Sequence, residues 1–212
     1  MELLTAVDPE RIVVEVESVA EIGPPWKWFE IDMDSPATGA PPREPGAGAG
    51  FRVSAMTTVP GLDNLAGIIG RSRGTIVTHL QFPVDAVEQG RRGVEMIDAA
   101  GIVPLPMIHR DDPPAGIDEL AAAIELLAQL PAPIIKLAYF APAEIHVDWG
   151  VRLLRSFRHD RSELAVVPMG TAAGRAAAYN AGSRLMWVPP RGDADRIGAD
   201  QLAPLLAGPP AG

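Results

Sequence analysis

The sequence predicts an α/β protein, a short form of the (β/α)8 TIM barrel that makes a single domain over residues 1–212. Short β-branched or apolar runs alternate with longer stretches of helical period, which is typical of parallel βα units. Eight such runs follow one another, as a closed barrel requires. The hydrophobic content of 47% and the charged content of 21% are ordinary for one globular core. A doubly wound open sheet is the structural alternative, because 212 residues is short for a closed barrel.

The predicted strands are the apolar runs whose length suits a buried strand. They are Ile12–Val16, Phe29–Met33, Arg52–Thr57, Thr75–Gln81, Ile102–His109, Pro133–Tyr139, Leu164–Met169 and Arg184–Val188. The helices that fit between them cover about residues 17–22, 61–72, 83–99, 116–130, 143–158, 172–181 and 199–207.

One segment interrupts this alternation. Residues 35–50 are too rich in proline and glycine to hold a regular helix, so we expect a surface loop in place of the second helix. Residues 208–212 are expected to form a frayed tail.

The composition narrows the classes of partner and of chemistry. The chain has no cysteine, so catalysis must use lysine, histidine, carboxylates or hydroxyls. A formal net charge of −9 disfavours nucleic acid and anionic membranes, because phosphate groups require a basic face. No apolar run reaches the roughly 18 residues that would cross a bilayer, and the first residues lack the pattern of a secretory signal. We therefore expect a cytoplasmic protein that acts on a small molecule.

Lysine is rare, and one of the two lysines stands in an unusual place. Of 18 basic side chains, only Lys27 and Lys136 are lysines. Lys136 interrupts the run from Pro133 to Phe140, which is otherwise suited to complete burial. Burial lowers the pKa of an ammonium group and yields the free amine that attacks a ketone or aldehyde. The alternative is a lysine that reaches out of a strand end or pairs with a core carboxylate.

Reactive residues of such barrels lie at the carboxyl ends of the strands. His109 ends the strand before that of Lys136, and neighbouring strands lie about 4.8 Å apart. Its imidazole is suited to removing a proton next to an iminium carbon and to returning it to a leaving hydroxyl. We expect the other polar or soft residues at predicted strand ends to bind the substrate, and these are Glu30, Asp32, Asp34, His79 and Met169.

These residues resemble a known family, the type I 3-dehydroquinate dehydratases, which are (β/α)8 barrels that use a lysine Schiff base. The run from His109 to Pro114 is similar to the family's histidine loop, and Ile134–Ala138 is similar to its lysine strand in the same register. The segment Pro168–Arg175 resembles the family's methionine and glycine loop, with a two-residue deletion before Arg175. The resemblance implies that Glu30, Asp34, Met169 and Arg175 bind substrate, that no cofactor or metal is needed, and that the protein forms a homodimer.

The chain also departs from the family's pattern. Asp32 stands where the family has an arginine, and the segment from Arg52 to Gly61 lacks the family's arginine and its histidine-orienting glutamate in register. The segment Trp187–Gly192 lacks the family's serine and glutamine contacts. We therefore expect retained iminium chemistry with altered substrate recognition, on 3-dehydroquinate or a related cyclic hydroxy-ketone.

Two other functions remain open from the residues alone. A metal-dependent barrel enzyme would use Glu30, Asp32, His79 and His109 as ligands of a divalent ion. A barrel that has lost catalysis would serve as a binding protein, and the missing arginines keep this alternative open.

Overall fold

The computed structural model describes residues 4, 7–17, 24–34, 51–193 and 196–206. The described part of the chain contains eight strands, all paired in parallel, in the sheet order β7-β6-β5-β4-β3-β2-β1-β8. The strands are β1 (Ile12–Val16), β2 (Trp28–Asp32), β3 (Arg52–Met56), β4 (Val77–Pro83), β5 (Val103–Arg110), β6 (Ile134–Phe140), β7 (Glu163–Met169) and β8 (Met186–Val188). Sequential order with β8 beside β1 confirms the predicted barrel and excludes the doubly wound sheet.

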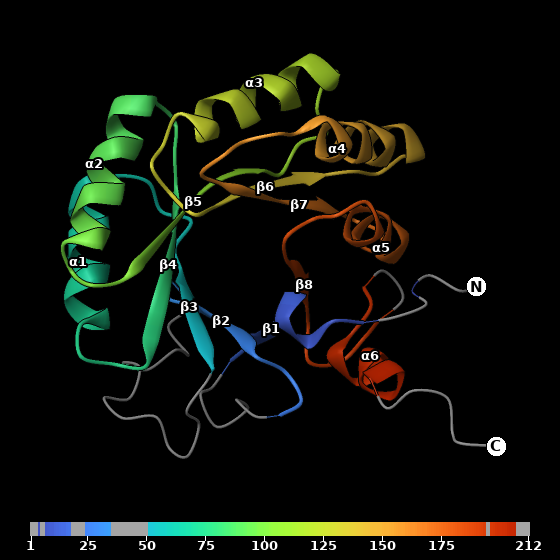
Figure 1. The fold of residues 1–212 in the computed structure, drawn as a ribbon, viewed down its shortest axis with the longest axis horizontal. Helices are drawn as coiled ribbons and strands as arrows, with labels where there is room; N and C mark the ends of the chain where they lie inside the picture. Colours follow the sequence, from blue (N-terminus) through green and yellow to red (C-terminus); the bar gives the residue numbers. More distant parts are fainter. Residues whose placement is uncertain (1–3, 5–6, 18–23, 35–50, 194–195, 207–212) are drawn as a thin grey trace.

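Six α-helices lie on the outside of the described strands, from α1 beside β4 to α6 near the chain end (Figure 1). They are α1 (Leu62–Ser72), α2 (Val87–Asp98), α3 (Ile117–Ala128), α4 (Glu144–Ser156), α5 (Ala172–Asn180) and α6 (Ala199–Leu206), and a 3-10 turn (Pro9–Arg11) precedes β1. The predicted helix over 17–22, the loop over 35–50 and the tail over 208–212 lie wholly or mostly outside the described residues.

The strands are buried on both sides, and the two sides have different neighbours. On β6, Ile135 and Leu137 pack outward into the cluster beneath the helices, whereas Ile134 and Ala138 belong to the cluster inside the barrel. Because side chains alternate along a strand, Lys136 points inward. The same alternation directs Glu15, Glu30 and Gln81 into the barrel, as their mutual contacts described below require.

The barrel is nearly closed, with a seam between β7 and β8 where no strand pairing is formed. The backbone N–H of Arg184 donates to the carbonyl of Leu164 at 2.9 Å. The buried hydroxyl of Ser183 accepts from the N–H of Val166 at 3.0 Å and donates to the carbonyl of Leu185 at 2.9 Å. A side chain therefore replaces part of the missing ladder.

One strand is displaced from its predicted position. We expected the fourth strand over Thr75–Gln81, but β4 runs from Val77 to Pro83. Thr75 instead belongs to a turn, where its hydroxyl donates to the carbonyl of Ser72 at 2.6 Å. The β-propensity of Thr75 and Ile76 is thus overridden by a local bond from a side chain to the backbone three residues earlier.

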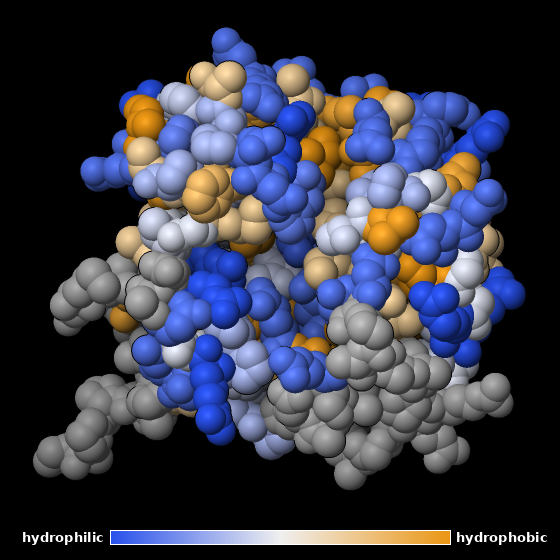
Figure 2. Space-filling view, turned by 180° about the vertical axis from the view of Figure 1, so that it is seen from behind, coloured by the Kyte–Doolittle hydropathy of each residue, from blue (hydrophilic) through white to orange (hydrophobic). Residues whose placement is uncertain are grey.

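Hydrophilic residues dominate the face in Figure 2, and hydrophobic residues appear there in small separate groups. Within the described residues, no helix is both long and apolar enough to cross a bilayer.

Candidate functional site

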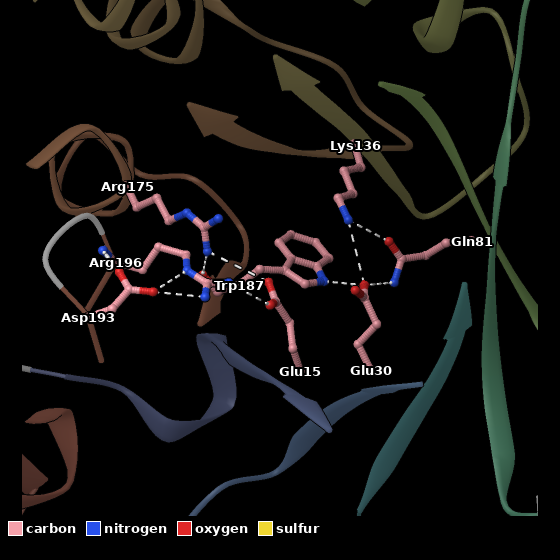
Figure 3. Close-up of polar contacts among 8 residues, drawn as sticks. All are labelled: Glu15, Glu30, Gln81, Lys136, Arg175, Trp187, Asp193 and Arg196. Atoms are coloured by element: carbon pink, nitrogen blue, oxygen red, sulfur yellow. Dashed lines mark hydrogen bonds and ion pairs between the residues drawn. The ribbon is translucent and has the colours of Figure 1, made fainter. Parts of the chain in front are cut away.

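Lys136 lies inside the barrel and is almost completely buried, with 4% of its surface exposed. Its Nζ atom donates a hydrogen bond to Oε1 of Gln81 at 2.7 Å and lies 3.6 Å from Oε2 of Glu30. The ring of Trp187 lies beside it, with the amine 4.0 Å from the ring centroid. Figure 3 shows these groups converging from β6, β4, β2 and β8. The amine therefore sits among one carboxylate, one amide and one aromatic face.

Glu30 and Gln81 hold one another in place around the amine. The Nε2 group of Gln81 donates to Glu30 and, at 3.0 Å, to the hydroxyl of Ser54. The indole N–H of Trp187 also donates to Glu30. Glu30 is 6% exposed and Gln81 is fully buried, so the network is shielded from water. A shielded network holds its members in fixed orientations.

Burial lowers the pKa of Lys136 from its ordinary value, and the negative charges of Glu30 and Glu15 oppose this effect. The carboxylate of Glu30 is also near enough to receive the amine's proton. Desolvation favours the neutral amine, which is the nucleophilic form.

His109 lies near the end of β5 on the strand next to Lys136. The register partner of Lys136 is Met107, two residues before His109 on the same side of the strand. Burial lowers the pKa of His109, while Asp111, 3.2 Å from Nε2, acts in the opposite direction. The charge of Lys136 also lowers this pKa. His109 remains accessible at the end of the barrel formed by the carboxyl ends of the strands, hereafter the mouth.

Arg175 extends from α5 to the seam between β7 and β8, where it contacts the backbone of β8. Its Nη1 group donates to the carbonyl of Trp187 at 2.7 Å and lies 3.6 Å from Oε1 of Glu15. Nη1 of Arg196 lies 3.9 Å from the other carboxylate oxygen of Glu15. Only 9% of Arg175 is exposed, so its guanidinium is part of the packed side of the barrel.

The two predicted acids that follow Glu30 lie on the surface rather than around the amine. Asp32 ends β2, and its carboxylate accepts the N–H of Asp34 at 2.9 Å. Asp34 accepts hydrogen bonds from the hydroxyl of Thr57 at 2.9 Å and from the N–H of Thr58 at 2.7 Å. Asp34 thereby fixes the loop after β3, which is a structural use of its carboxylate.

The position of His79 corrects a prediction. We placed it at the end of the fourth strand, but β4 continues to Pro83. His79 therefore lies near the start of β4, two residues before Gln81 and on the same inward side of the strand. Its ring packs against Trp28 with the centroids 4.5 Å apart. Met169 does end β7 at the mouth, where it packs on the inner cluster.

The described residues do not assemble the metal site that the alternative hypothesis required. No three His, Asp or Glu side chains among them lie in an arrangement that could hold a metal ion. The metal hypothesis required Glu30, Asp32, His79 and His109 to share one ion, and that ligand set is wrong for this structure.

A cavity of about 570 Å³ lies at the opposite end of the barrel, lined by several arginines. Arg11 donates to the carbonyls of Tyr179 at 2.9 Å and Ser183 at 2.6 Å, and Arg158 donates to that of Arg155 at 2.9 Å. Arg184 pairs with Glu163 at 2.8 Å. Arg11 and Arg158 thus satisfy carbonyls at or just beyond the ends of α5 and α4, and Arg184 is held by a carboxylate, so all three have structural tasks.

Comparison with solved structures gives the same architecture. The 3-dehydroquinate dehydratase of Enterococcus faecalis superposes with a TM-score of 0.69 and 12% identity, over 93% of this chain and 92% of the other. The type I enzyme of Clostridium difficile, solved with covalently modified comenic acid, gives 0.69 and 11%, over 93% and 91%. The enzyme of Aquifex aeolicus gives 0.67 and 12%, over 92% and 96%.

The chain shares the fold of these dehydratases. No family model matches the sequence, and no curated protein matches it either.

Several residues of the network were missed by sequence reasoning, among them Glu15, Gln81 and Arg196. Glu15 and Gln81 are polar residues inside apolar strands, which is the same signal that identified Lys136. Arg196 carried no comparable signal, because it follows β8 in an irregular segment.

Proposed function

We propose that the protein is a lyase that forms a Schiff base between Lys136 and a β-hydroxy ketone and then eliminates water. The observation that carries the proposal is the buried amine of Lys136, held 2.7 Å from Gln81 and 3.6 Å from Glu30. A lysine at 4% exposure inside an apolar barrel has no role in solubility, and its depressed pKa suits a nucleophile. The shared fold with 3-dehydroquinate dehydratases adds support.

The reaction begins when the neutral amine of Lys136 adds to the carbonyl carbon. The resulting carbinolamine loses water and becomes an iminium ion. His109 then removes a proton from the adjacent carbon, and the C–H electron pair moves toward the iminium nitrogen to give an enamine. The enamine expels the β-hydroxyl, which leaves as water with the proton returned by His109. Hydrolysis of the conjugated iminium releases the enone and restores the amine.

The neighbouring groups have separate tasks in this scheme. Glu30 takes the proton from the ammonium, and Gln81 orients the amine. The face of Trp187 stabilises the positive charge of the iminium ion. The lowered pKa of His109 keeps its imidazole neutral, and so able to accept a proton, at neutral pH.

Reductive trapping tests the proposal. Incubation with a hydroxy-ketone and cyanoborohydride should add one reduced substrate to the protein, and peptide mapping should place it on Lys136. The variant Lys136→Ala should lose this adduct. The same assay should follow the absorbance of the conjugated product, with 3-dehydroquinate among the substrates.

Lys27 provides a matched control, because it is the chain's other lysine and lies half-buried outside the network. The variant Lys27→Ala should be trapped as efficiently as the wild type. Equal adduct in wild type and Lys136→Ala, or an adduct that maps to Lys27, would overturn the proposal. Absence of any adduct would favour a barrel that binds without catalysis.

A further inference from the structure

We propose that the mouth selects a carbonyl substrate that carries no carboxylate, and that Glu15 sets this preference. The inference rests on the proposed Schiff-base function and names the substrate class, an uncharged hydroxy-ketone or hydroxy-aldehyde. The resemblance suggested the opposite, a substrate anion held by Arg175.

Arg175 already has partners for its charge. Its Nη1 group lies 3.6 Å from Glu15 and donates to the carbonyl of Trp187 at 2.7 Å. The carbonyl lies at the seam, where β8 has no pairing with β7. A substrate carboxylate at Arg175 would have to displace Glu15 and leave that half-buried acid beside the buried Glu30, its register partner on β2. Such like-charge contact in a buried site is unfavourable.

Arg196 is paired in the same way. It lies 3.9 Å from Glu15 and 2.8 Å from Asp193, and Figure 3 shows both arginines directed toward Glu15 from the same side. Both arginines near the mouth network therefore face carboxylates of the protein itself.

The balance of charge in the mouth points the same way. Lys136 must be neutral to attack a carbonyl, so it contributes no positive charge at that step. The proton that Lys136 loses passes to Glu30, so this pair adds no net charge, and among the other groups of the network Glu15 and Asp193 offset Arg175 and Arg196. A substrate carboxylate would therefore lose its hydration at the mouth without gaining an unpaired cation from this network, whereas an uncharged carbonyl compound pays no such cost.

Two small ketones of similar size test the inference, hydroxyacetone as the neutral probe and pyruvate as the anionic probe. The measured quantity is the ratio of their cyanoborohydride trapping rates on Lys136, divided by the same ratio for the side-chain amine of Nα-acetyl-lysine. This division removes the different intrinsic reactivity of the ketones. We expect a corrected ratio of about ten for the wild type, in favour of hydroxyacetone. The ratio for Glu15→Gln should be about tenfold lower.

Glu163→Gln is the matched control, because Glu163 also pairs with an arginine but lies at the opposite end of the barrel. It makes the same change in net charge and should leave the ratio at the wild-type value. If Glu15→Gln does not fold, the wild type still gives an answer: added salt should move its ratio toward one.

The outcomes separate the two proposals. Failure to trap either ketone on Lys136 refutes the Schiff-base function. Trapping of both ketones with a corrected ratio at or below one, or a ratio unchanged by Glu15→Gln, refutes the selectivity while the Schiff-base function stands.

Discussion

His79 and Lys136 are both basic side chains inside the barrel, and burial lowers the pKa of each. Their surroundings nevertheless differ. Lys136 has a carboxylate 3.6 Å away, whereas His79 packs on Trp28 and feels the positive charge of Arg52. The same physical effect thus leaves one residue available for chemistry and makes the other a neutral part of the core.

Acidification should destabilise the protein through His79. Its pKa is lowered to about 4 in the folded state, against an ordinary value of 6.5. Between these values the unfolded chain binds a proton that the folded chain does not, so stability falls as the pH falls. The loss should reach about 2 kcal/mol between pH 7 and pH 5. Urea unfolding of wild type and His79→Leu at both pH values measures it, because the variant lacks this contribution.

An exposed histidine serves as the control for this measurement. His159→Gln should show the same pH dependence as the wild type, since His159 lies in an exposed loop. Equal pH dependence in wild type and His79→Leu would show that His79 does not account for the acid sensitivity.

At the scale of elements, α2 lies against the barrel through two glycines on one face. A Cβ atom at Gly90 would meet Leu130 and Val84 at 2.9 Å, and one at Gly93 would collide with the ring of Phe82. On α1, by contrast, Gly70 is exposed and a Cβ atom there would meet nothing within 4 Å. The two helices therefore use glycine for different reasons.

Alanine substitution should separate these reasons. Gly93→Ala should lower the free energy of unfolding by about 1–3 kcal/mol, because the added methyl group must push Phe82 or α2 aside. Gly70→Ala should raise it by about 0.5–1 kcal/mol, because alanine is the better helix former. Denaturant unfolding of both variants measures the two effects. Changes of the same sign would contradict the close approach of α2.

Sequence reasoning located strands where an apolar run in the sequence marks the strand by itself. The apolar runs around Lys136 and His109 placed β5 and β6 to within about one residue at each end. The start of β4 was wrong by two residues, because the β-branched residues Thr75 and Ile76 were assigned to the strand although the Thr75 hydroxyl closes a local turn onto Ser72. The pairing of Arg175 with Glu15 could not be predicted, because α5 and β1 meet only after the barrel closes.

At the scale of the whole molecule, closure depends on the seam between β7 and β8. Seven strand pairings carry the barrel, and the eighth is replaced by contacts from Ser183, Arg184 and Arg175. Removal of the Ser183 hydroxyl leaves the buried N–H of Val166 without this acceptor.

Ser183→Ala should therefore lower the free energy of unfolding by about 1–3 kcal/mol. Hydrogen exchange should also become faster at the amide of Val166. Ser72→Ala is the control: Ser72 is equally buried, but its hydroxyl has no hydrogen-bond partner among the described residues. That variant should be neutral or more stable. A loss in Ser72→Ala as large as in Ser183→Ala would remove the special role of the seam.

Trp187 gives this barrel an intrinsic fluorophore at the reacting atom. Its ring lies 4.0 Å from the amine of Lys136, and its indole N–H is bonded to Glu30. An indole's emission responds to charge at such short range, and the proposed conversion of the amine to an iminium ion would change the charge there. The emission of Trp187, separated from that of the other three tryptophans by comparison with Trp187→Phe, should therefore report the proposed conversion of Lys136 without any added label.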